Sequence, residues 1–297
     1  MPELDRKQAL VVDADPQIDM AVMAVLSPEE WHVVHVQDNA AALEWAGTKR
    51  IDLVITGPST SGKQDVTLLR AIRRIQPDVR VIILTDRSTP ADVIASMRER
   101  AFAYFTTPFT PEVFEHMVRN AMADGWEDGV KVVSATPEWI CLLVRCDLQS
   151  ADRLMQFMKE IACLPPEELQ PVGIAFREML MNAIRYGGKF DPDKYVEISY
   201  VKARHAVACK VKDPGVGFAL DELYHAAVAN PADNPLRHLN YREAAGLPAG
   251  GYGILLTRHM VDELIYNEQG NEVLLIKYLD QEDPAAKQVR QGPILPL

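Results

Sequence analysis

A carboxylate and an amide four residues apart, Glu178 and Asn182, are residue types that can act on a metal-bound phosphate. Both fall in a predicted helix over residues 167–185, where this spacing places them on one face. An amide oxygen can complete the oxygen shell of Mg²⁺ beside phosphates and waters. A carboxylate one turn earlier can orient a water or a hydroxyl, or take its proton. Alone, the same spacing also fits an amphipathic helix with a polar surface.

A second segment, Asp213-Pro-Gly215-Val-Gly217, follows a predicted strand over residues 205–212. A carboxylate at the end of a strand can accept a hydrogen bond from the exocyclic amine of adenine. The two glycines would let the backbone pass close to the ring. A tight turn is the alternative interpretation of this segment, because the same residue types favour turns.

A third segment, Gly250-Gly251-Tyr252-Gly253, precedes a predicted helix over residues 253–261. Glycines ahead of a helix N-terminus can present backbone N–H groups to an anion such as a phosphate. A flexible hinge is the alternative. The three segments together therefore indicate a metal-bound nucleotide, although each alone fits a simpler role.

In their order and spacing, the three segments resemble the N, G1 and G2 boxes of the GHKL family of ATP-binding domains. The resemblance implies an α/β sandwich, the Bergerat fold, that binds ATP and Mg²⁺. It implies that Asn182 holds Mg²⁺, that Asp213 binds adenine and that residues 219–249 form an ATP lid. The glycines implied to contact ATP are Gly215, Gly217, Gly250, Gly251 and Gly253.

Within this family, FREMLMNAIRYGGKF and GGYGILLTRHMVDEL are most similar to the anti-sigma-factor serine/threonine kinases. Members of that branch phosphorylate a Ser or Thr of an anti-sigma antagonist (a STAS protein) and bind a sigma factor. The resemblance implies that Glu178 is the base, and it makes a homodimer plausible. Arg185 and Lys189 lie near the first box, where they would contact phosphate or a partner, or be solvated surface residues.

Two other functions stay open. A non-catalytic adaptor would bind ATP, or merely keep the fold, and sequester a sigma factor or another regulator. A histidine kinase would need a phosphoacceptor His before the ATP domain, and the predicted helix over residues 148–163 contains none; His116 is the nearest candidate. Gyrase-type and Hsp90-type proteins need large extra domains that this chain lacks.

The first half of the chain alternates short apolar strands with helices, which predicts a doubly wound parallel sheet covered on both faces. The strands are expected at residues 9–12, 32–36, 52–56, 81–85 and 103–105. Their order and the segments VVDADP, DLVITGPSTSG, LTD and YFTTPF resemble the (βα)5 receiver domain of two-component response regulators.

The phosphorylation chemistry of a receiver is incomplete in this sequence. Phosphoryl transfer to a carboxylate needs a cation and a lysine to neutralise charge. The resemblance places Gly57 at the accepting aspartate and Thr107 at the lysine. It also places Ala14 at one of the two acidic metal ligands, while Asp13 remains.

These losses predict a pseudo-receiver that serves as a protein-binding or dimerising surface. Thr85 is retained, and receiver geometry would make the Thr107–Pro108 bond cis. A rearranged site built on Asp15 or Asp65 is the alternative.

Charge and composition argue against several other classes of function. A net charge of −11 argues against non-specific nucleic-acid binding and against anionic membrane surfaces. The chain has no signal-peptide or membrane-spanning apolar run, and its four cysteines lack C-x-x-C spacing, so we expect a cytoplasmic protein with reduced thiols. The predicted boundaries are 1–124 for the receiver-like domain, 125–137 for a linker, 138–282 for the ATP-binding domain and 283–297 for a tail.

Overall fold

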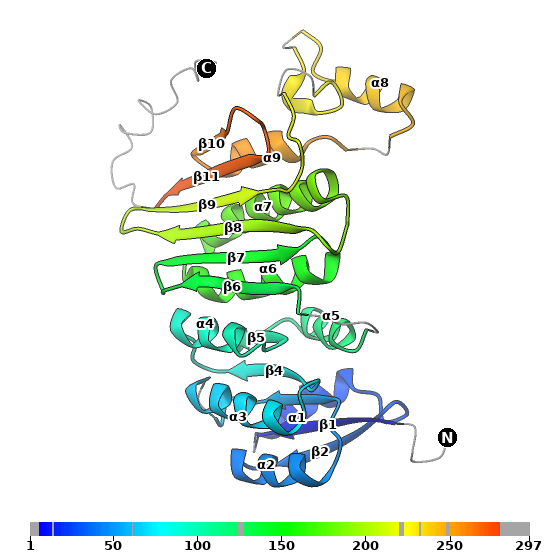
Figure 1. Cartoon of the computed structure of the whole chain (residues 1–297), viewed down its shortest axis with the longest axis vertical. Helices are drawn as coiled ribbons and strands as arrows, with labels where there is room; N and C mark the ends of the chain where they lie inside the picture. The colour runs from blue at the N-terminus through cyan, green and yellow to red at the C-terminus, as the bar shows by residue number, and fades with distance from the viewer. Residues whose placement is uncertain are drawn as a thin grey trace. The chain divides into compact units, whose positions relative to one another are not determined.

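The structure of the chain is a computed structural model (Figure 1). It describes residues 6–13, 15–60, 62–123, 128–219, 223–231, 233–247 and 250–279. Ala14, parts of the predicted lid and linker, and the predicted tail lie outside the described residues. Contacts divide the chain into two compact units. The first comprises Met1–Pro137, Leu142–Cys163 and Asp191–Asp193, and the second comprises Glu138–Cys141, Leu164–Phe190 and Lys194–Leu297.

The first unit contains a parallel five-stranded sheet with the strand order β2-β1-β3-β4-β5. This confirms the predicted doubly wound sheet, and every predicted strand is present. The strands are β1 (Lys7–Val12), β2 (Trp31–Val36), β3 (Leu53–Thr56), β4 (Arg80–Thr85) and β5 (Ala103–Thr106). The connecting helices are α1 (Pro16–Val25), α2 (Asn39–Thr48), α3 (Gly62–Ile75), α4 (Pro90–Arg98) and α5 (Pro111–Ala121).

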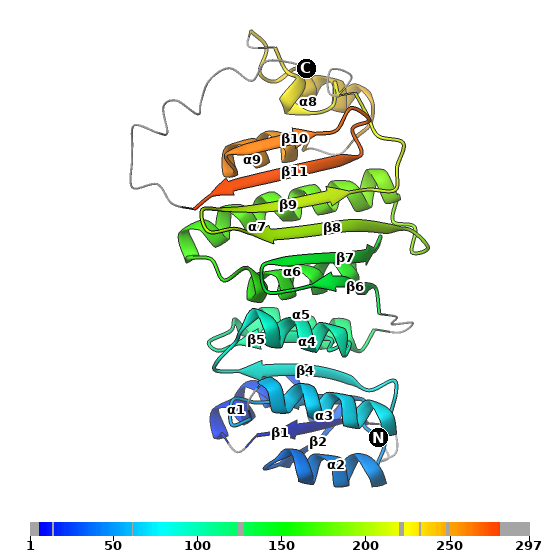
Figure 2. The ribbon, with the colours of Figure 1, turned by 60° about the vertical axis from the view of Figure 1, so that its left-hand side comes forward.

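The second sheet has six strands in the order β10-β11-β9-β8-β7-β6 (Figures 1 and 2). Its strands β8, β9, β11 and β10 pair antiparallel. The strands are β6 (Val130–Ala135), β7 (Trp139–Arg145), β8 (Tyr195–Lys202), β9 (Ala206–Lys212), β10 (Glu263–Tyr266) and β11 (Glu272–Tyr278). The helices that accompany it are α6 (Leu148–Ala162), α7 (Pro166–Asn182), α8 (Arg237–Ala244) and α9 (Gly253–Met260).

This arrangement confirms a mixed α/β fold in the second half of the chain. Helix α7 contacts β9, β11 and α9, and the buried side chains of β9 alternate at Val207, Cys209 and Val211. Such alternation is expected of a strand with one face against a helix layer. The segment predicted as a linker contains strand β6, whose Val130, Val132 and Val133 favour extended backbone.

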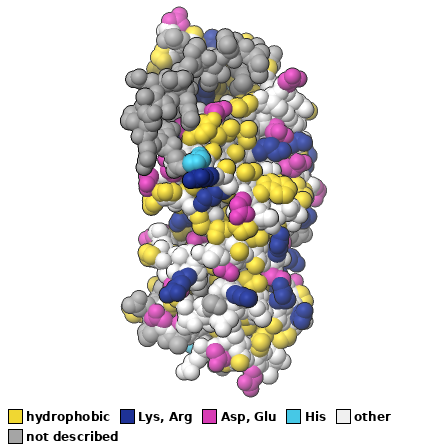
Figure 3. All heavy atoms as spheres, turned by 90° about the vertical axis from the view of Figure 1, so that its left-hand side faces the viewer, with side chains coloured by type: hydrophobic (Ala, Val, Ile, Leu, Met, Phe, Trp, Pro, Cys, Tyr) yellow, Lys and Arg dark blue, Asp and Glu magenta, His cyan; other side chains and the backbone are white. Residues whose placement is uncertain are grey.

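The surface carries mixed charge. On the face shown in Figure 3, Lys and Arg side chains are interspersed with Asp and Glu, and hydrophobic side chains gather between them. No helix among the described residues combines the length and the apolar composition that crossing a lipid bilayer requires.

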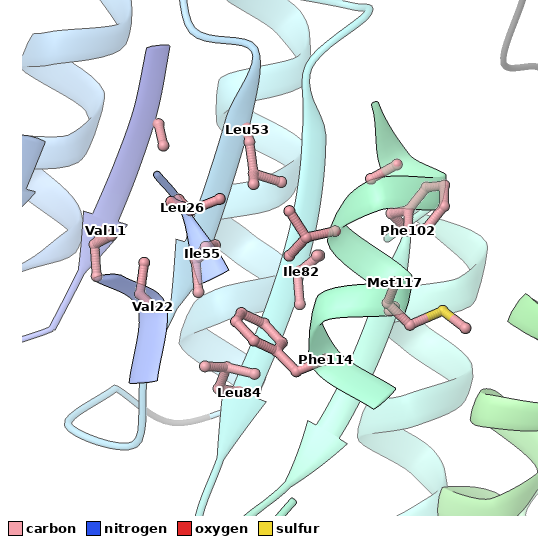
Figure 4. Close-up of a cluster of buried hydrophobic side chains, with 14 of the residues drawn as sticks. Val11, Val22, Leu26, Leu53, Ile55, Ile82, Leu84, Phe102, Phe114 and Met117 are labelled. Carbon is pink, nitrogen blue, oxygen red and sulfur yellow. The ribbon is translucent and has the colours of Figure 1, made fainter. Parts of the chain in front are cut away.

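One hydrophobic cluster of the first sheet lies on the face under α1 and α5 (Figure 4). Alternate residues of β3, Leu53 and Ile55, point to this face because side chains of a strand alternate between faces. Phe114 and Met117 of α5 and Val22 of α1 pack against them. This packing holds the carboxyl ends of the strands, where Asp13 and Gly57 lie, in fixed positions.

Strand β5 is at the edge of its sheet, and helix α6 covers that edge within the first unit. Arg153 of α6 is buried and donates to two carbonyl oxygens, those of Phe102 and Ala101, at 3.0 Å each. Its third contact is with a carboxylate oxygen of Asp128 at 3.1 Å. An edge strand exposes unpaired backbone groups, and here an arginine side chain pairs with two carbonyl groups of the residues that directly precede β5.

Two further side chains of α6 bond to the same strand. Gln156 Nε2 donates to the carbonyl oxygen of Tyr104 at 2.9 Å. The Glu160 carboxylate accepts from the backbone N–H of Thr106 at 3.3 Å and from its hydroxyl at 2.6 Å. Asp147 caps the start of this helix, because its side chain accepts from a backbone N–H in the first turn. Polar side chains of α6 therefore replace a neighbouring strand along β5.

Candidate functional site

A cavity of about 370 Å³ opens in the second unit. Its volume is within the range of small-molecule and cofactor sites. Its walls come from the end of α7, the segment after β9, the start of α9 and the edge of β11. Six predicted site residues line it: Asn182, Asp213, Gly215, Gly217, Gly251 and Gly253.

Asp213 follows the last residue of β9 and is half-buried. One carboxylate oxygen accepts from the N–H of Gly215 at 2.7 Å. Burial raises the pKa of Asp213, and the Gly215 hydrogen bond opposes that shift. The backbone therefore holds this carboxylate in one orientation in the cavity wall. A hydrogen-bond acceptor for a ligand needs such a fixed orientation.

Gly187 is a site residue that the sequence interpretation missed, because it was assigned only to a helix end. A Cβ at Gly187 would lie 2.2 Å from the Asp213 carboxylate, so a side chain there would displace it. Gly217 has a positive φ of 83°, and a Cβ there would meet the carbonyl oxygen of Gln269 at 1.8 Å. Both positions thus require glycine for steric reasons.

Helix α7 brings the predicted metal ligand and the predicted base to the start of α9. A Cβ at Gly253 would lie 2.7 Å from Glu178 Oε2 and 3.7 Å from Asn182 Nδ2. Glu178 and Asn182 therefore share one face of α7, as their spacing predicts, and the bare Gly253 backbone lies against both. Glu178 is beside the cavity rather than among its lining residues.

The chain is helical through residue 185, as predicted, but the type of helix changes. Helix α7 ends at Asn182, and a π-helical turn follows directly over Ala183–Gly188. Such turns are rare and occur frequently at functional sites. The turn carries Tyr186 and Gly187 into the cavity wall, so the change of helix type positions lining residues.

Residues of the predicted lid contact the glycine segment before α9. Gly251 has a φ of 91°, and a Cβ there would lie 2.5 Å from the carbonyl oxygen of His225. The Gly251 carbonyl oxygen accepts from the N–H of Ala227 at 2.8 Å. Gly250 is not a lining residue, but it directly precedes this contact.

Three basic side chains also line the cavity: Lys189, Lys194 and Arg242. The sequence interpretation considered Lys189 but not Lys194 or Arg242, which belong to no recognised box. Arg185, the other basic candidate, is not among the lining residues. Basic groups beside glycine-rich backbone suit a polyanionic ligand.

Comparison with protein families decides the identity of both halves. Residues 144–277 match the family described as the histidine kinase-like ATPase domain, and residues 9–119 match the response regulator receiver domain. The chain is a receiver domain fused to a histidine kinase-like ATPase domain. The resemblances to a receiver domain and to the ATP-binding family are thereby confirmed. The anti-sigma-factor branch, the domain boundaries and the roles of single site residues stay predictions.

Curated proteins that match this chain include response regulators. The transcriptional regulatory protein GlrR of Escherichia coli (strain K12) is 26% identical over 113 residues, which are 38% of this chain and 26% of GlrR. The nitrate/nitrite response regulator protein NarP of the same strain is 29% identical over 121 residues, 40% of this chain and 56% of NarP. The chain thus spans between about a quarter and somewhat over half of the length of these two relatives.

Among solved structures, a receiver domain protein from Clostridium thermocellum is 29% identical. The match covers 39% of this chain and 94% of that one, with a TM-score of 0.34. A response regulator from Thermotoga maritima is 23% identical, with coverages of 39% and 98% and a TM-score of 0.36.

In the receiver domain, the carboxylate of Asp13 fills the space beside Gly57. A Cβ at Gly57 would lie 1.8 Å from Asp13 Oδ2. That carboxylate already accepts from the backbone N–H groups of Ser59, at 3.1 Å, and Asp15. A phosphate-accepting side chain at residue 57 therefore has no room in this arrangement.

The other receiver positions are also engaged. Thr85 is buried and donates from its hydroxyl to the carbonyl oxygen of Arg87 at 2.8 Å. The Thr107–Pro108 bond is cis, as predicted.

Asp65 is fully buried at the start of α3 and accepts from the hydroxyl of Thr60. Burial, with a smaller contribution from the Asp13 carboxylate, raises the pKa of Asp65 to about 7.

Proposed function

We propose that this protein is an Mg²⁺- and ATP-dependent serine/threonine kinase of the anti-sigma-factor type, acting in partner switching in the cytoplasm. Its substrate would be a STAS-type antagonist, its second partner a sigma factor, and the receiver domain a regulatory part that accepts no phosphoryl group. The observation that carries the proposal is the convergence of Glu178, Asn182 and Gly253 beside the cavity that Asp213 lines. A homodimer remains a prediction.

Each group has a role that its chemistry supports. Bound Mg²⁺ would neutralise phosphate charge, and the Asn182 amide oxygen is the predicted ligand. Asp213 would accept from the adenine amine, since its carboxylate is already oriented by the Gly215 N–H. Glu178 would accept the proton of the attacking hydroxyl. Transfer of a phosphoryl group depends mainly on such positioning and charge neutralisation.

The test is phosphate transfer from radiolabelled ATP to a purified STAS-type antagonist encoded in the same genome. Glu178→Gln should lower the transfer rate by about 10²–10⁴-fold, the usual contribution of a general base. Its affinity for ATP should stay within about twofold of wild type. Glu167→Gln is the matched control, because Glu167 is exposed in the first turn of the same helix and should leave transfer unchanged.

The adaptor alternative makes the opposite prediction. In this alternative the ATPase domain would lack catalytic chemistry, as the receiver domain does at Gly57, and would serve only to bind a partner. No transfer in the wild type, with partner binding that is equal in wild type and Glu178→Gln, would favour the adaptor.

The assay also separates the histidine-kinase alternative. The ring of His116 is half exposed, and its Nε2 lies 2.9 Å from a carboxylate oxygen of Asp152. Acid-labile phosphate on His116 would contradict the serine/threonine assignment. Acid-stable phosphate on a Ser or Thr of the antagonist would support it.

A further inference from the structure

Helix α8, in the segment that the sequence assigns to the ATP lid, turns two long polar side chains inward. His238 is 0% exposed and Arg242 is 6% exposed. They are four residues apart, so they share one face of the helix. Both lie against the glycine segment: a Cβ at Gly251 would be 3.2 Å from His238 Cδ2 and 3.4 Å from Arg242 Nη1.

The hydrogen bonds of Asn230 fix the tautomer of His238. Asn230 Nδ2 donates to the carbonyl oxygen of Pro235 at 2.6 Å, and Asn230 Oδ1 accepts from the backbone N–H of His238 at 2.9 Å. The nitrogen of the amide therefore faces His238 Nδ1, at 2.7 Å, and donates to it. Since Nδ1 is an acceptor in the neutral ring, the proton resides on Nε2. Burial and the charge of Arg242 lower the pKa of His238, which favours this neutral form.

His238 Nε2 has no hydrogen-bond partner among the described residues. A buried N–H donor without an acceptor is costly, and in native proteins it usually calls for an explanation such as a missing ligand. Cδ2, the ring atom bonded to Nε2, is the one nearest to Gly251. The unpaired donor therefore lies beside the glycine segment.

Arg242 supplies a positive charge at the same place. Its Nη1 donates to the carbonyl oxygen of His225 at 3.1 Å, and its Nη2 lies 3.8 Å from the position of a Cβ at Gly250. Arg242 lines the cavity. A guanidinium group carries several donors in a planar fork that matches phosphate oxygens.

We propose that Arg242 and the Nε2–H of His238 bind the phosphate tail of the nucleotide against Gly250 and Gly251. This inference rests on the proposed ATP site. It makes helix α8 part of the binding site, because its basic side chains complement the charge of the phosphates. Asn230 is then a positioning residue, since it orients the imidazole without touching the ligand.

The test compares the affinities of variants for ATP, adenosine and inorganic tripolyphosphate by calorimetric and NMR titration. Arg242→Ala should weaken ATP and tripolyphosphate binding at least tenfold and leave adenosine binding within twofold. Arg242→Lys should restore part of the affinity. His238→Asn keeps an acceptor towards Asn230 but lacks the Nε2–H, and it should weaken ATP binding several-fold. Arg258→Ala, an exposed arginine of α9, is the matched charge control and should bind like wild type.

Two results would overturn the proposal: unchanged ATP affinity in Arg242→Ala, or an equal loss for ATP and adenosine, which would indicate a structural role. Melting temperatures of all variants identify misfolding, and Arg242→Lys keeps the test valid if the alanine variant unfolds. Wild-type protein that binds neither ATP nor tripolyphosphate would sink the ATP function and this inference together. Arg242-dependent binding of tripolyphosphate without any binding of ATP would sink the ATP function alone.

Discussion

At the scale of single residues, two carboxylates show how burial changes chemistry in this chain. Asp213 is half-buried and oriented by a backbone N–H, so it can serve as an acceptor at the cavity wall. Asp65 is fully buried near the vestigial receiver site, and its pKa is raised to about 7. The first residue is suited to bind a ligand, whereas the second couples the stability of the receiver domain to pH.

The raised pKa of Asp65 predicts a specific pH dependence of stability. Between its ordinary pKa of 3.8 and about 7, the folded state binds more protons at this site than the unfolded state does. The contribution of Asp65 to the free energy of unfolding therefore falls as pH rises through this window and is constant above it. The total fall is on the order of 4 kcal/mol, since one pKa unit corresponds to about 1.4 kcal/mol.

Asp65→Asn removes that titration while keeping an oxygen that accepts from Thr60. Urea unfolding of both proteins from pH 5 to pH 8 measures the effect. The variant should gain stability relative to wild type as pH rises. Parallel curves for the two proteins across this range would contradict the account.

Gly57 and Arg242 mark the limits of prediction at this scale. The resemblance to receiver domains predicts the loss of the phosphate acceptor at Gly57, because glycine has no side chain. The position of Arg242 is not, since it lies in a polar stretch without a motif and reaches the cavity only through the packing of α8. Short motifs therefore predicted six of the residues that line the cavity, and tertiary contacts supplied the others.

At the scale of elements, periodic sequence patterns predicted most strands and long helices. Strand β9 lies within the predicted range 205–212 because its apolar residues alternate cleanly. Strand β6 lies within the predicted linker over residues 125–137, where it follows Gly- and Asp-rich residues. Helix α8 was missed because His238 and Arg242, its buried residues, are polar types that a hydrophobic pattern does not detect.

Helix α6 matters most for the first unit, because it covers the edge of β5. Arg153 pairs with two carbonyl oxygens there and is 2% exposed. Arg153→Met would keep much of the volume but leave Asp128 and two carbonyls without this partner. We expect a loss of about 3–5 kcal/mol in the free energy of unfolding, as when one partner of a buried charge pair is removed.

Urea unfolding measures this loss, and hydrogen exchange of residues 101–106 shows whether β5 opens. Lys159→Met is the matched control, since Lys159 is exposed on the same helix; its effect should stay within about 0.5 kcal/mol. Equal effects of the two substitutions would mean that the Arg153 contacts do not stabilise the edge strand.

At the scale of the whole molecule, the chain joins a receiver domain to a histidine kinase-like ATPase domain. Helix α6 falls within the residues that match the ATPase family, yet it packs on β5 of the receiver domain within the first unit. The receiver domain thus packs against a helix of the segment that matches the ATPase family. This packing is a structural role that needs no phosphorylation.

A small phosphoryl donor should therefore leave the protein unmodified. With acetyl phosphate and Mg²⁺, intact-mass spectrometry should find no added phosphoryl group, because Gly57 has no carboxylate to accept it. A variant that carries Gly57→Asp alone should also stay unmodified. Stoichiometric phosphorylation of the wild type on Asp15 or Asp65 would establish a rearranged site instead.

The central claim is that the cavity beside Asp213 binds ATP with Mg²⁺. The most direct test is the melting temperature of wild type and Asp213→Asn with and without millimolar Mg·ATP. A ligand that binds only the folded state stabilises it by about 2.7 kcal/mol at a hundredfold excess over its Kd. We predict a rise in the melting temperature of wild type that is absent in Asp213→Asn. No rise in the wild type, or an equal rise in both proteins, would contradict the claim.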